Sequence, residues 1–319
     1  MRRIKPAQLE QLDLSSLVSL GNGAEPVNPA VLDAFFDTFA PRGLRCEALS
    51  PAYGLAEATL MMSCCRPGDA PRITRLRADA LTEGRAVLTD DPAVTSRRVT
   101  SCGAPLGSIR LAIVDPETRV ECEAGHVGEI WLKDPCVALG YWRNDAATQD
   151  TFRATIAGAG EGPFLRTGDL GFMLDGELYI TSRMKDLIVV AGANHYPQDI
   201  EWSVENCHPA IRPGHVAASS VDVGGEERLV VAPEVERGAL KTQEDIAALA
   251  AAVRGAVAEQ HELAVHAILI LQRGALPKTA SGKIQRHACA HFLRDDSPEV
   301  IARWVAGKGL VLPAEEAAS

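Results

Sequence analysis

Near its end, the sequence carries a short loop in which two lysines stand among small residues. The loop reads Leu276-Pro277-Lys278-Thr279-Ala280-Ser281-Gly282-Lys283-Ile284. Small side chains and a glycine allow an ammonium group to come close to a phosphate or a carboxylate. The loop is not a Walker P-loop, because Pro277 stands where the first glycine belongs and Ile284 replaces the Ser/Thr. Taken alone, such a loop is more often an ordinary surface turn, since lysines are mostly solvated.

An aspartate and an arginine upstream of this loop could bind the ribose or a phosphate of a nucleotide. Asp169 follows Thr167 and Gly168 at the end of an expected strand, and Arg183 lies 14 positions further on. An aspartate after a tight glycine turn can accept two hydrogen bonds from a ribose diol, and an arginine can reinforce the same hydroxyls or contact a phosphate. Any single tripeptide of this kind is more often a strand-to-turn cap than a nucleotide site.

The composition narrows the classes of protein. A formal charge of −10 and a pI near 5.3 argue against a nucleic-acid partner, because phosphate binding needs a basic surface. The eight cysteines contain no C-x-x-C pair, so we expect reduced thiols in a cytoplasmic protein. The first residues lack the apolar segment of a signal peptide, and no stretch has the apolar length of a membrane span, so we expect the chain to be neither exported nor inserted.

The first part of the chain is expected to form an α/β layer. Asn28 and Pro29 provide a cap and a first-turn proline for a helix that ends before Pro41. We expect a strand over residues 44–49 and a second helix over 58–62. Residues 63–101 contain many arginines and little apolar periodicity, so they are predicted to form an exposed insertion.

Short strands are predicted between residues 109 and 180, with a hairpin turn at Asp175-Gly176, which gives a β-subdomain or a distorted barrel. The remaining pattern mixes strands and helices and predicts a small α+β domain. Its strands are expected over 187–190, 216–221, 229–233 and 265–271, and its helices over 197–205 and about 242–262. The expected fold class is therefore α/β plus α+β, with domains over 1–182 and 183–319.

Considered together, the motifs resemble the adenylate-forming superfamily, which comprises acyl-CoA synthetases, luciferases and peptide-synthetase adenylation domains. Their order and spacing carry the resemblance over almost the whole chain. The motifs are Gly21–Pro26, Tyr53–Thr59, Gly128-Glu129, Thr167–Asp169, Arg183–Asp186, Tyr196–Glu201 and Lys278–Lys283. Within the superfamily, the wording of three segments is most similar to a fatty acyl-AMP ligase: GNGAEPV from Gly21, YGLAEATL from Tyr53 and GANHYPQDIE from Gly192.

The resemblance implies a role for each matching residue. Lys283 would be the catalytic lysine that bridges carboxylate and phosphate, Glu57 would ligate Mg²⁺, and Lys185 would be the hinge between two domain orientations. Asp169 and Arg183 would hold the ribose, Gly23 to Pro26 would line the adenine, and Tyr53 would stack on it. The nucleotide-binding set is then Gly23, Ala24, Glu25, Pro26, Tyr53, Gly54, Asp169 and Arg183.

The resemblance also implies the cofactors and the partners. The reaction would use ATP and Mg²⁺ to activate a fatty acid as acyl-adenylate. The acyl group would pass to an acyl-carrier protein or a synthase carrier domain, with the insertion at 63–101 disfavouring coenzyme A. The family's phosphate loop belongs to a front portion absent from this sequence, so we expect dependence on a separate N-terminal half. Two alternatives stay open: a non-catalytic truncated remnant that binds a partner, and a fragment of an acyl-CoA synthetase.

Overall fold

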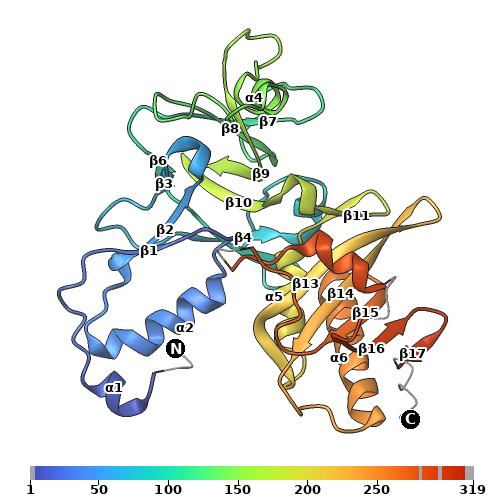
Figure 1. The fold of residues 1–319 in the computed structure, drawn as a ribbon. Helices are drawn as coiled ribbons and strands as arrows, with labels where there is room; N and C mark the ends of the chain where they lie inside the picture. The colour runs from blue at the N-terminus through green and yellow to red at the C-terminus, as the bar shows by residue number, and fades with distance from the viewer. Residues whose placement is uncertain (1–3, 280–281, 294–296, 313–319) are drawn as a thin grey trace. The chain divides into compact units, whose positions relative to one another are not determined.

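The computed structural model describes residues 4–279, 282–293 and 297–312 of the chain. It divides into two compact units, Met1–Met184 and Lys185–Ser319 (Figure 1). Each unit has a hydrophobic core of its own. Within the described ranges, none of the helices combines the length and the apolar character needed to span a bilayer.

The first unit opens with a four-stranded sheet in the order β1-β2-β3-β6, where β1 (Leu20–Asn22) runs parallel to β2 (Leu49–Gly54). The other two strands are β3 (Met61–Cys64) and β6 (Ala104–Pro105), and a short helix, α1 (Pro6–Glu10), precedes the sheet. The predicted first helix is confirmed as α2 (Pro29–Phe39), because the Asn28 side chain accepts a hydrogen bond from Ala30 N at 2.9 Å. The helix buries Leu32 and Phe39, whereas Val31 stays 55% exposed.

Two of the expected elements in this layer are wrong. Residues 44–49 are not a strand: Cys46–Ala48 form a 3₁₀ turn, and the strand β2 begins only at Leu49. The expected helix over 58–62 is limited to the 3₁₀ turn η3 (Ala56–Ala58), since Thr59 takes a positive φ of 70° and β3 follows. Both segments are apolar and short, so their periodicity does not distinguish strand from helix.

The stretch over residues 63–101 has more structure than the sequence indicated. It contains β4 (Ile73–Arg77), α3 (Ala78–Thr82) and β5 (Ser96–Thr100), and β4 pairs with β5 in antiparallel fashion. Leu76 and Leu81 are almost fully buried, at 0% and 2% exposure. The expectation of an exposed segment is therefore wrong for these strands, because a few apolar positions among many arginines are enough to form a small core.

The β-subdomain is an open antiparallel sheet in the order β10-β9-β8-β7, so a closed barrel is not formed by the described strands. Its strands are β7 (Arg110–Val114), β8 (Gly128–Lys133), β9 (Leu165–Leu174) and β10 (Glu177–Arg183), and α4 (Asp145–Phe152) lies in the β8–β9 connection. The predicted hairpin is confirmed: Asp175 and Gly176 both have positive φ, 51° and 78°, as a type I′ turn requires.

The second unit is built on a five-stranded sheet in the order β13-β14-β15-β16-β17. Its elements are β11 (Ile188–Val190), β12 (Ala193–His195), α5 (Pro197–Glu205), β13 (Ile211–Val223), β14 (Glu226–Val235), α6 (Gln243–His261), β15 (Val265–Leu271), η5 (Arg286–Leu293), β16 (Val300–Val305) and β17 (Gly309–Val311). The 3₁₀ turn η4 (Met184–Asp186) lies at the division between the units. The sequence predicted β11, α5, β13, β14, α6 and β15, but not β12, β16 or β17.

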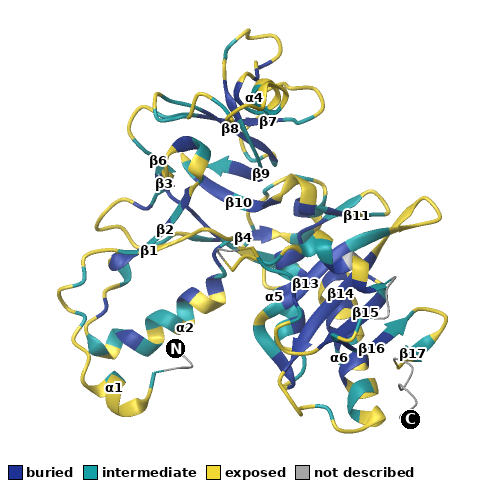
Figure 2. Cartoon of the chain, in the orientation of Figure 1, coloured by how far each residue is buried: buried dark blue, intermediate teal, exposed yellow. Residues whose placement is uncertain are grey.

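Both faces of this sheet are buried, as Figure 2 shows for its central strands. Alternate strand residues point to opposite faces, so Ala218 and Ile268 join a core with α5 and α6. Ala217 and Leu269 join a second core on the other face, together with Phe292 of η5. The segment that carries Lys283 therefore leads into the element that covers the second face of the sheet.

A buried hydrogen bond attaches β4 to β10. Thr74 Oγ1 lies 2.9 Å from the Tyr179 hydroxyl, and the Tyr179 ring stacks on Phe172 with centroids 4.9 Å apart. We expect Tyr179→Phe to lower the free energy of unfolding of the first unit by about 1–2 kcal/mol, because it leaves the Thr74 hydroxyl without this partner. The measurement is urea denaturation. Thr74→Val/Tyr179→Phe should cost less than the sum of the single changes, and strict additivity would contradict the coupling.

Candidate active site

Asp169 is the centre of the candidate site in the first unit. It pairs directly across the β9–β10 ladder with Arg183, whose Nε donates to Asp169 Oδ1 at 3.0 Å. The Tyr53 hydroxyl on β2 donates to the other carboxylate oxygen, Oδ2, at 2.8 Å. The structure thus brings Tyr53 and Arg183 to one carboxylate, although Tyr53 lies 116 positions before Asp169 in the sequence, and the two donors hold that carboxylate in a fixed orientation.

Tyr53 has a second role that the sequence did not predict. Its side chain is only 8% exposed and belongs to the core that contains Met62 and Leu178. Burial raises the pKa of the Tyr53 phenol well above its usual value, and the Asp169 charge raises it further. The phenol therefore stays protonated and acts as a hydrogen-bond donor to Asp169. Stacking of its ring on an adenine stays a prediction.

Asp169 lies inside β9, not at the end of a strand as the sequence predicted, and the strand makes a tight turn between Arg166 and Leu170, where its register with β8 shifts and Gly168 has a φ of 69°. A buried glutamate underlies this turn. Glu129 on β8 is 1% exposed, and its Oε1 accepts a hydrogen bond from Gly168 N at 3.1 Å. Its Oε2 accepts hydrogen bonds from Trp131 Nε1 at 2.8 Å and from Arg166 Nε at 3.0 Å. The carboxylate is thus fully engaged, and it fixes the backbone immediately before Asp169.

The glycine-rich loop after β1 lies against the strand that carries Tyr53. A Cβ at Gly23 would stand 2.6 Å from the Ala52 carbonyl oxygen, so only glycine fits this approach. Ala24 has a positive φ of 73°, and Ala24 and Glu25 are exposed. At the far end of β2, a Cβ at Gly54 would collide with the Leu60 carbonyl oxygen at 1.7 Å. Both glycines are explained by close backbone packing, and an adenine-lining role for Gly23–Pro26 stays a prediction.

Glu57 lies on η3, directly after β2, and its carboxylate is held by a tyrosine. The Tyr141 hydroxyl donates to Glu57 Oε1 at 3.0 Å, and Ala138 N donates to the Glu57 carbonyl at 2.8 Å. Burial raises the pKa of Tyr141, and the hydrogen bond to Glu57 adds to the shift, so the phenol remains a donor. The described residues include no cluster of three or more acidic, histidine or cysteine side chains suited to a metal. Any cation at Glu57 would need ligands from elsewhere.

The two lysines of the predicted site lie in the second unit. Lys185 is exposed in η4, and Lys283 is exposed in a loop that precedes η5. Thr279 N donates to the Lys283 carbonyl at 2.9 Å, and Lys283 N donates to Thr279 Oγ1 at 3.1 Å. Ala280 and Ser281 of the predicted loop lie outside the described residues.

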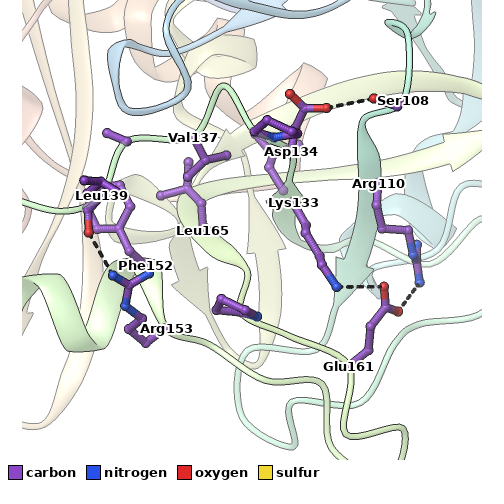
Figure 3. Close-up of a pocket in the computed structure, with 14 residues that line it drawn as sticks. Ser108, Arg110, Lys133, Asp134, Val137, Leu139, Phe152, Arg153, Glu161 and Leu165 are labelled. Atoms are coloured by element: carbon purple, nitrogen blue, oxygen red, sulfur yellow. Dashed lines mark hydrogen bonds and ion pairs between the residues drawn. The ribbon is translucent and has the colours of Figure 1, made fainter.

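A separate pocket of about 600 Å³ opens in the β-subdomain (Figure 3). Its apolar lining includes Leu139 and Phe152, and Arg153 Nη2 donates to the Leu139 carbonyl at 3.1 Å. Figure 3 shows Lys133 and Arg110 directed at Glu161, at 3.9 Å and 3.4 Å. The residues that line this pocket include none of those predicted for the site, so the pocket adds no member to the Asp169 cluster.

Glu129 and Tyr141 are the functional candidates to which the sequence assigned no role. A glutamate inside the apolar strand sequence EIWL was the available signal for Glu129, because a charge in such a strand must find partners. No comparable signal marked Tyr141, whose partner lies 84 positions away.

Family models and curated proteins match most of the chain. A family model described as AMP-binding enzyme matches residues 1–142, and one described as the AMP domain of Disco-interacting protein 2-like proteins matches residues 185–298. The chain is 49% identical over 291 residues to a medium-chain-fatty-acid–[acyl-carrier-protein] ligase, JamA, of Moorena producens. It is 41% identical over 303 residues to a 4-hydroxyphenylalkanoate adenylyltransferase of Mycobacterium marinum. These alignments cover 91% and 93% of the chain.

Solved structures show the same relationship. A structure from work on the fatty acyl-adenylate ligases of E. coli and L. pneumophila matches 92% of the chain and 50% of its own, with a TM-score of 0.80 and 28% identity. The fatty acid AMP ligase of Legionella pneumophila matches 95% of the chain and 52% of its own, with a TM-score of 0.58 and 37% identity. The chain spans about half the length of the curated relatives it matches, 49% and 48%.

Removing the charge of Glu129 tests its role beneath the turn. We expect Glu129→Gln to lower the free energy of unfolding of the first unit by about 3–5 kcal/mol, because Arg166 loses its buried counter-charge. Glu161→Gln is the matched control: Glu161 also pairs with an arginine but is 35% exposed, so its loss should cost below about 1 kcal/mol. Urea denaturation measures both changes, and equal small losses would show that Glu129 does not organise the turn.

Proposed function

The chain belongs to the adenylate-forming superfamily of AMP-binding enzymes, and from this premise we propose that it is the carboxy-terminal portion of a fatty acyl-AMP ligase. The reaction would join a fatty carboxylate to the α-phosphate of ATP, giving acyl-adenylate and pyrophosphate. The product acyl group would then pass to a carrier protein. The observation that carries the proposal is the Asp169 carboxylate, which Tyr53 holds on one oxygen and Arg183 on the other.

The Asp169 cluster is suited to a ribose diol. Two hydroxyl groups need two acceptor oxygens at a fixed spacing, and a carboxylate held on both oxygens supplies them without reorganisation. Carboxylate oxygens have further lone pairs beyond the bonds from Tyr53 and Arg183, so the hydroxyls need not displace either donor. The Arg183 side chain is 54% exposed, which leaves its guanidinium accessible to a ligand.

Glu57 fits a magnesium ligand of the kind that works with a nucleotide. Mg²⁺ commonly binds through one or two carboxylates, with substrate phosphates and water completing its shell. A single carboxylate fixed by Tyr141, without a dedicated protein cage among the described residues, matches that mode. When bound, the cation would offset the negative charge of the triphosphate. Glu57 would contribute a pre-oriented oxygen, with Tyr141 preventing it from turning away.

Lys283 would supply the positive charge that the adenylation step needs. The fatty carboxylate and the α-phosphate are both anions, so their approach is favoured only if a cation stands between them. The exposed ammonium of Lys283 can reach such a position if the second unit turns about Lys185, which we propose as the hinge. The domain boundary would then be functional, with the unit Met1–Met184 presenting the nucleotide and the unit Lys185–Ser319 delivering the lysine.

The proposed partners are inferred from the names of the relatives and from the share of their length that this chain covers. The Moorena producens relative is named for an acyl-carrier protein, and we propose a carrier protein or carrier domain as the acceptor here. Because the chain spans about half of its relatives, we propose that activity needs a further N-terminal portion with the phosphate loop. We place the protein in the cytoplasm, where its eight free thiols would stay reduced.

The central test is ATP–pyrophosphate exchange with medium-chain fatty acids. The protein to use is a fusion of this chain to the portion of the Moorena producens ligase outside the region of similarity. We expect exchange in the fusion and a loss of about 100-fold or more on Lys283→Ala, because one preorganised charge at the reacting atoms is removed. Lys308→Ala is the control, since Lys308 is an exposed lysine of the same unit.

Two results would refute the proposal. One is a folded fusion without exchange for any fatty acid, which would favour a non-catalytic remnant. The other is equal exchange by the Lys283→Ala and Lys308→Ala forms. A completed enzyme that forms thioester with coenzyme A as readily as with a carrier protein would refute the choice of acceptor.

A further inference from the structure

The loop that carries Lys283 is closed as a small hairpin. Gln285 N donates to the Pro277 carbonyl at 2.9 Å, and Lys278 and Ile284 form an antiparallel bridge. Together with the bonds between Thr279 and Lys283, these contacts define what we call the lysine hairpin, the described residues 276–279 and 282–286. Closing a hairpin fixes its internal shape, but it does not fix the direction in which the hairpin points.

The first end of the lysine hairpin is attached to a buried carboxylate. Leu276 N donates to Glu234 Oε1 at 2.7 Å, and Glu234 is 1% exposed on β14. The Glu234 carboxylate is also paired with Arg212 of β13. The hairpin therefore starts from a fixed point on the central sheet.

The second end is held by Arg286. Its Nε and Nη2 donate to the two oxygens of Glu201 at 2.7 Å and 2.8 Å, and its Nη1 donates to Asp186 Oδ2 at 3.2 Å. All three side chains are largely buried: the exposed fractions are 19% for Arg286, 6% for Glu201 and 8% for Asp186. A bidentate arginine–carboxylate pair is directional, so it fixes the backbone on both sides.

Glu201 also connects this pair to the sheet. Its Oε1 accepts a hydrogen bond from Ala218 N at 3.0 Å. Ala218 lies on β13, the edge strand of the five-stranded sheet, and Glu201 lies on α5. The carboxylate thus joins the helix, the sheet edge and Arg286.

The partner on the other side of Arg286 follows the proposed hinge directly. Asp186 is the next residue after Lys185, and its second oxygen lies 3.2 Å from His287 Nε2. Burial opposes the charge of Arg286, but the hydrogen bonds and charges of Glu201 and Asp186 outweigh it and raise the pKa of Arg286 above its usual value. Arg286 therefore stays charged and links residue 186 to the end of the lysine hairpin.

We propose that Arg286 is a positioning residue, which fixes the lysine hairpin to α5 and to the residue after Lys185, so that Lys283 turns as one body with the start of the second unit. The inference rests on the proposed function for what Lys283 does, but the attachment itself does not. Without Arg286, the hairpin keeps its Glu234 attachment at the first end, but its second end is released, so that its internal bonds open more often and Lys283 loses its direction. A rotation at Lys185 then no longer delivers the ammonium to a defined point.

The attachment is tested by hydrogen exchange in the present chain. Arg286→Lys keeps the charge but lacks the planar fork that makes the bidentate pair with Glu201, and Arg286→Ala removes both the charge and the fork. We expect the amides of Lys283 and Gln285 to exchange at least about 10-fold faster in Arg286→Ala, with an intermediate rate in Arg286→Lys, while the α6 amides keep their rates. Arg228→Lys is the control, because the Arg228–Glu226 pair of the same unit is 50% and 68% exposed.

The positioning role is tested by the kinetics of adenylation in the same fusion enzyme. A misplaced reacting group costs rate, whereas nucleotide affinity depends on the first unit. We expect kcat to fall about 100-fold in Arg286→Ala and about 10-fold in Arg286→Lys, with the KM for ATP within about two-fold of the parent. Arg228→Lys should leave both values unchanged.

The outcomes separate the two claims. Unchanged amide exchange in both Arg286 variants overturns the attachment. Faster exchange with an unchanged kcat overturns positioning and leaves Arg286 a structural residue. If the parent fusion itself shows no adenylation, the proposed function fails, and the hydrogen exchange alone decides whether Arg286 fixes the hairpin.

Discussion

The candidate site depends on the burial of one carboxylate, that of Glu129. A charged group with 1% exposure persists in a protein only if its lone pairs are occupied, and Trp131, Arg166 and Gly168 N occupy them. The last of these bonds fixes the turn before Asp169. Asp169, in turn, is oriented by Tyr53 and Arg183. The Asp169 carboxylate, which we propose holds the ribose, thus depends for its position on a second, buried carboxylate beneath it.

In the second unit, buried ion pairs likewise fix the backbone that carries an exposed charged group, here the ammonium of Lys283. The lysine hairpin presents Lys283 to solvent, and its two ends are fixed by Glu234 and by Arg286, each within a buried ion pair. Buried ion pairs contribute little to stability compared with apolar packing, since desolvation opposes their attraction. They do confer direction, which apolar contacts do not. If an enzyme must bring a lysine to a defined point, directional ion pairs can fix the orientation of the segment that carries it, which apolar packing alone does not do.

The sequence predicted the elements whose signals are local. The Asn28 cap, the Asp175-Gly176 turn and the alanine-rich helix α6 each depend on neighbours within a few positions. It misplaced β2, because short segments fit several elements, and it missed β4 and β5, because their few apolar positions stand among arginines; tertiary pairing decides both cases. The residues proposed for the nucleotide site were inferred from the resemblance of the motifs to the family. The sequence could not predict which side chains these residues contact, because the partners are far apart along the chain. Tyr53 lies 116 positions from Asp169, and Arg286 lies 85 positions from Glu201.

The most direct measurement of the central claim is a binding cycle on Asp169. It uses a non-hydrolysable acyl-adenylate analogue with an intact ribose and its 2′,3′-dideoxy counterpart, each titrated into the fusion enzyme and its Asp169→Asn form. If Asp169 holds the ribose, the parent prefers the intact ribose by about 10-fold or more, and the variant shows almost no preference. An Asp169→Asn enzyme that keeps the full preference of the parent would contradict the account.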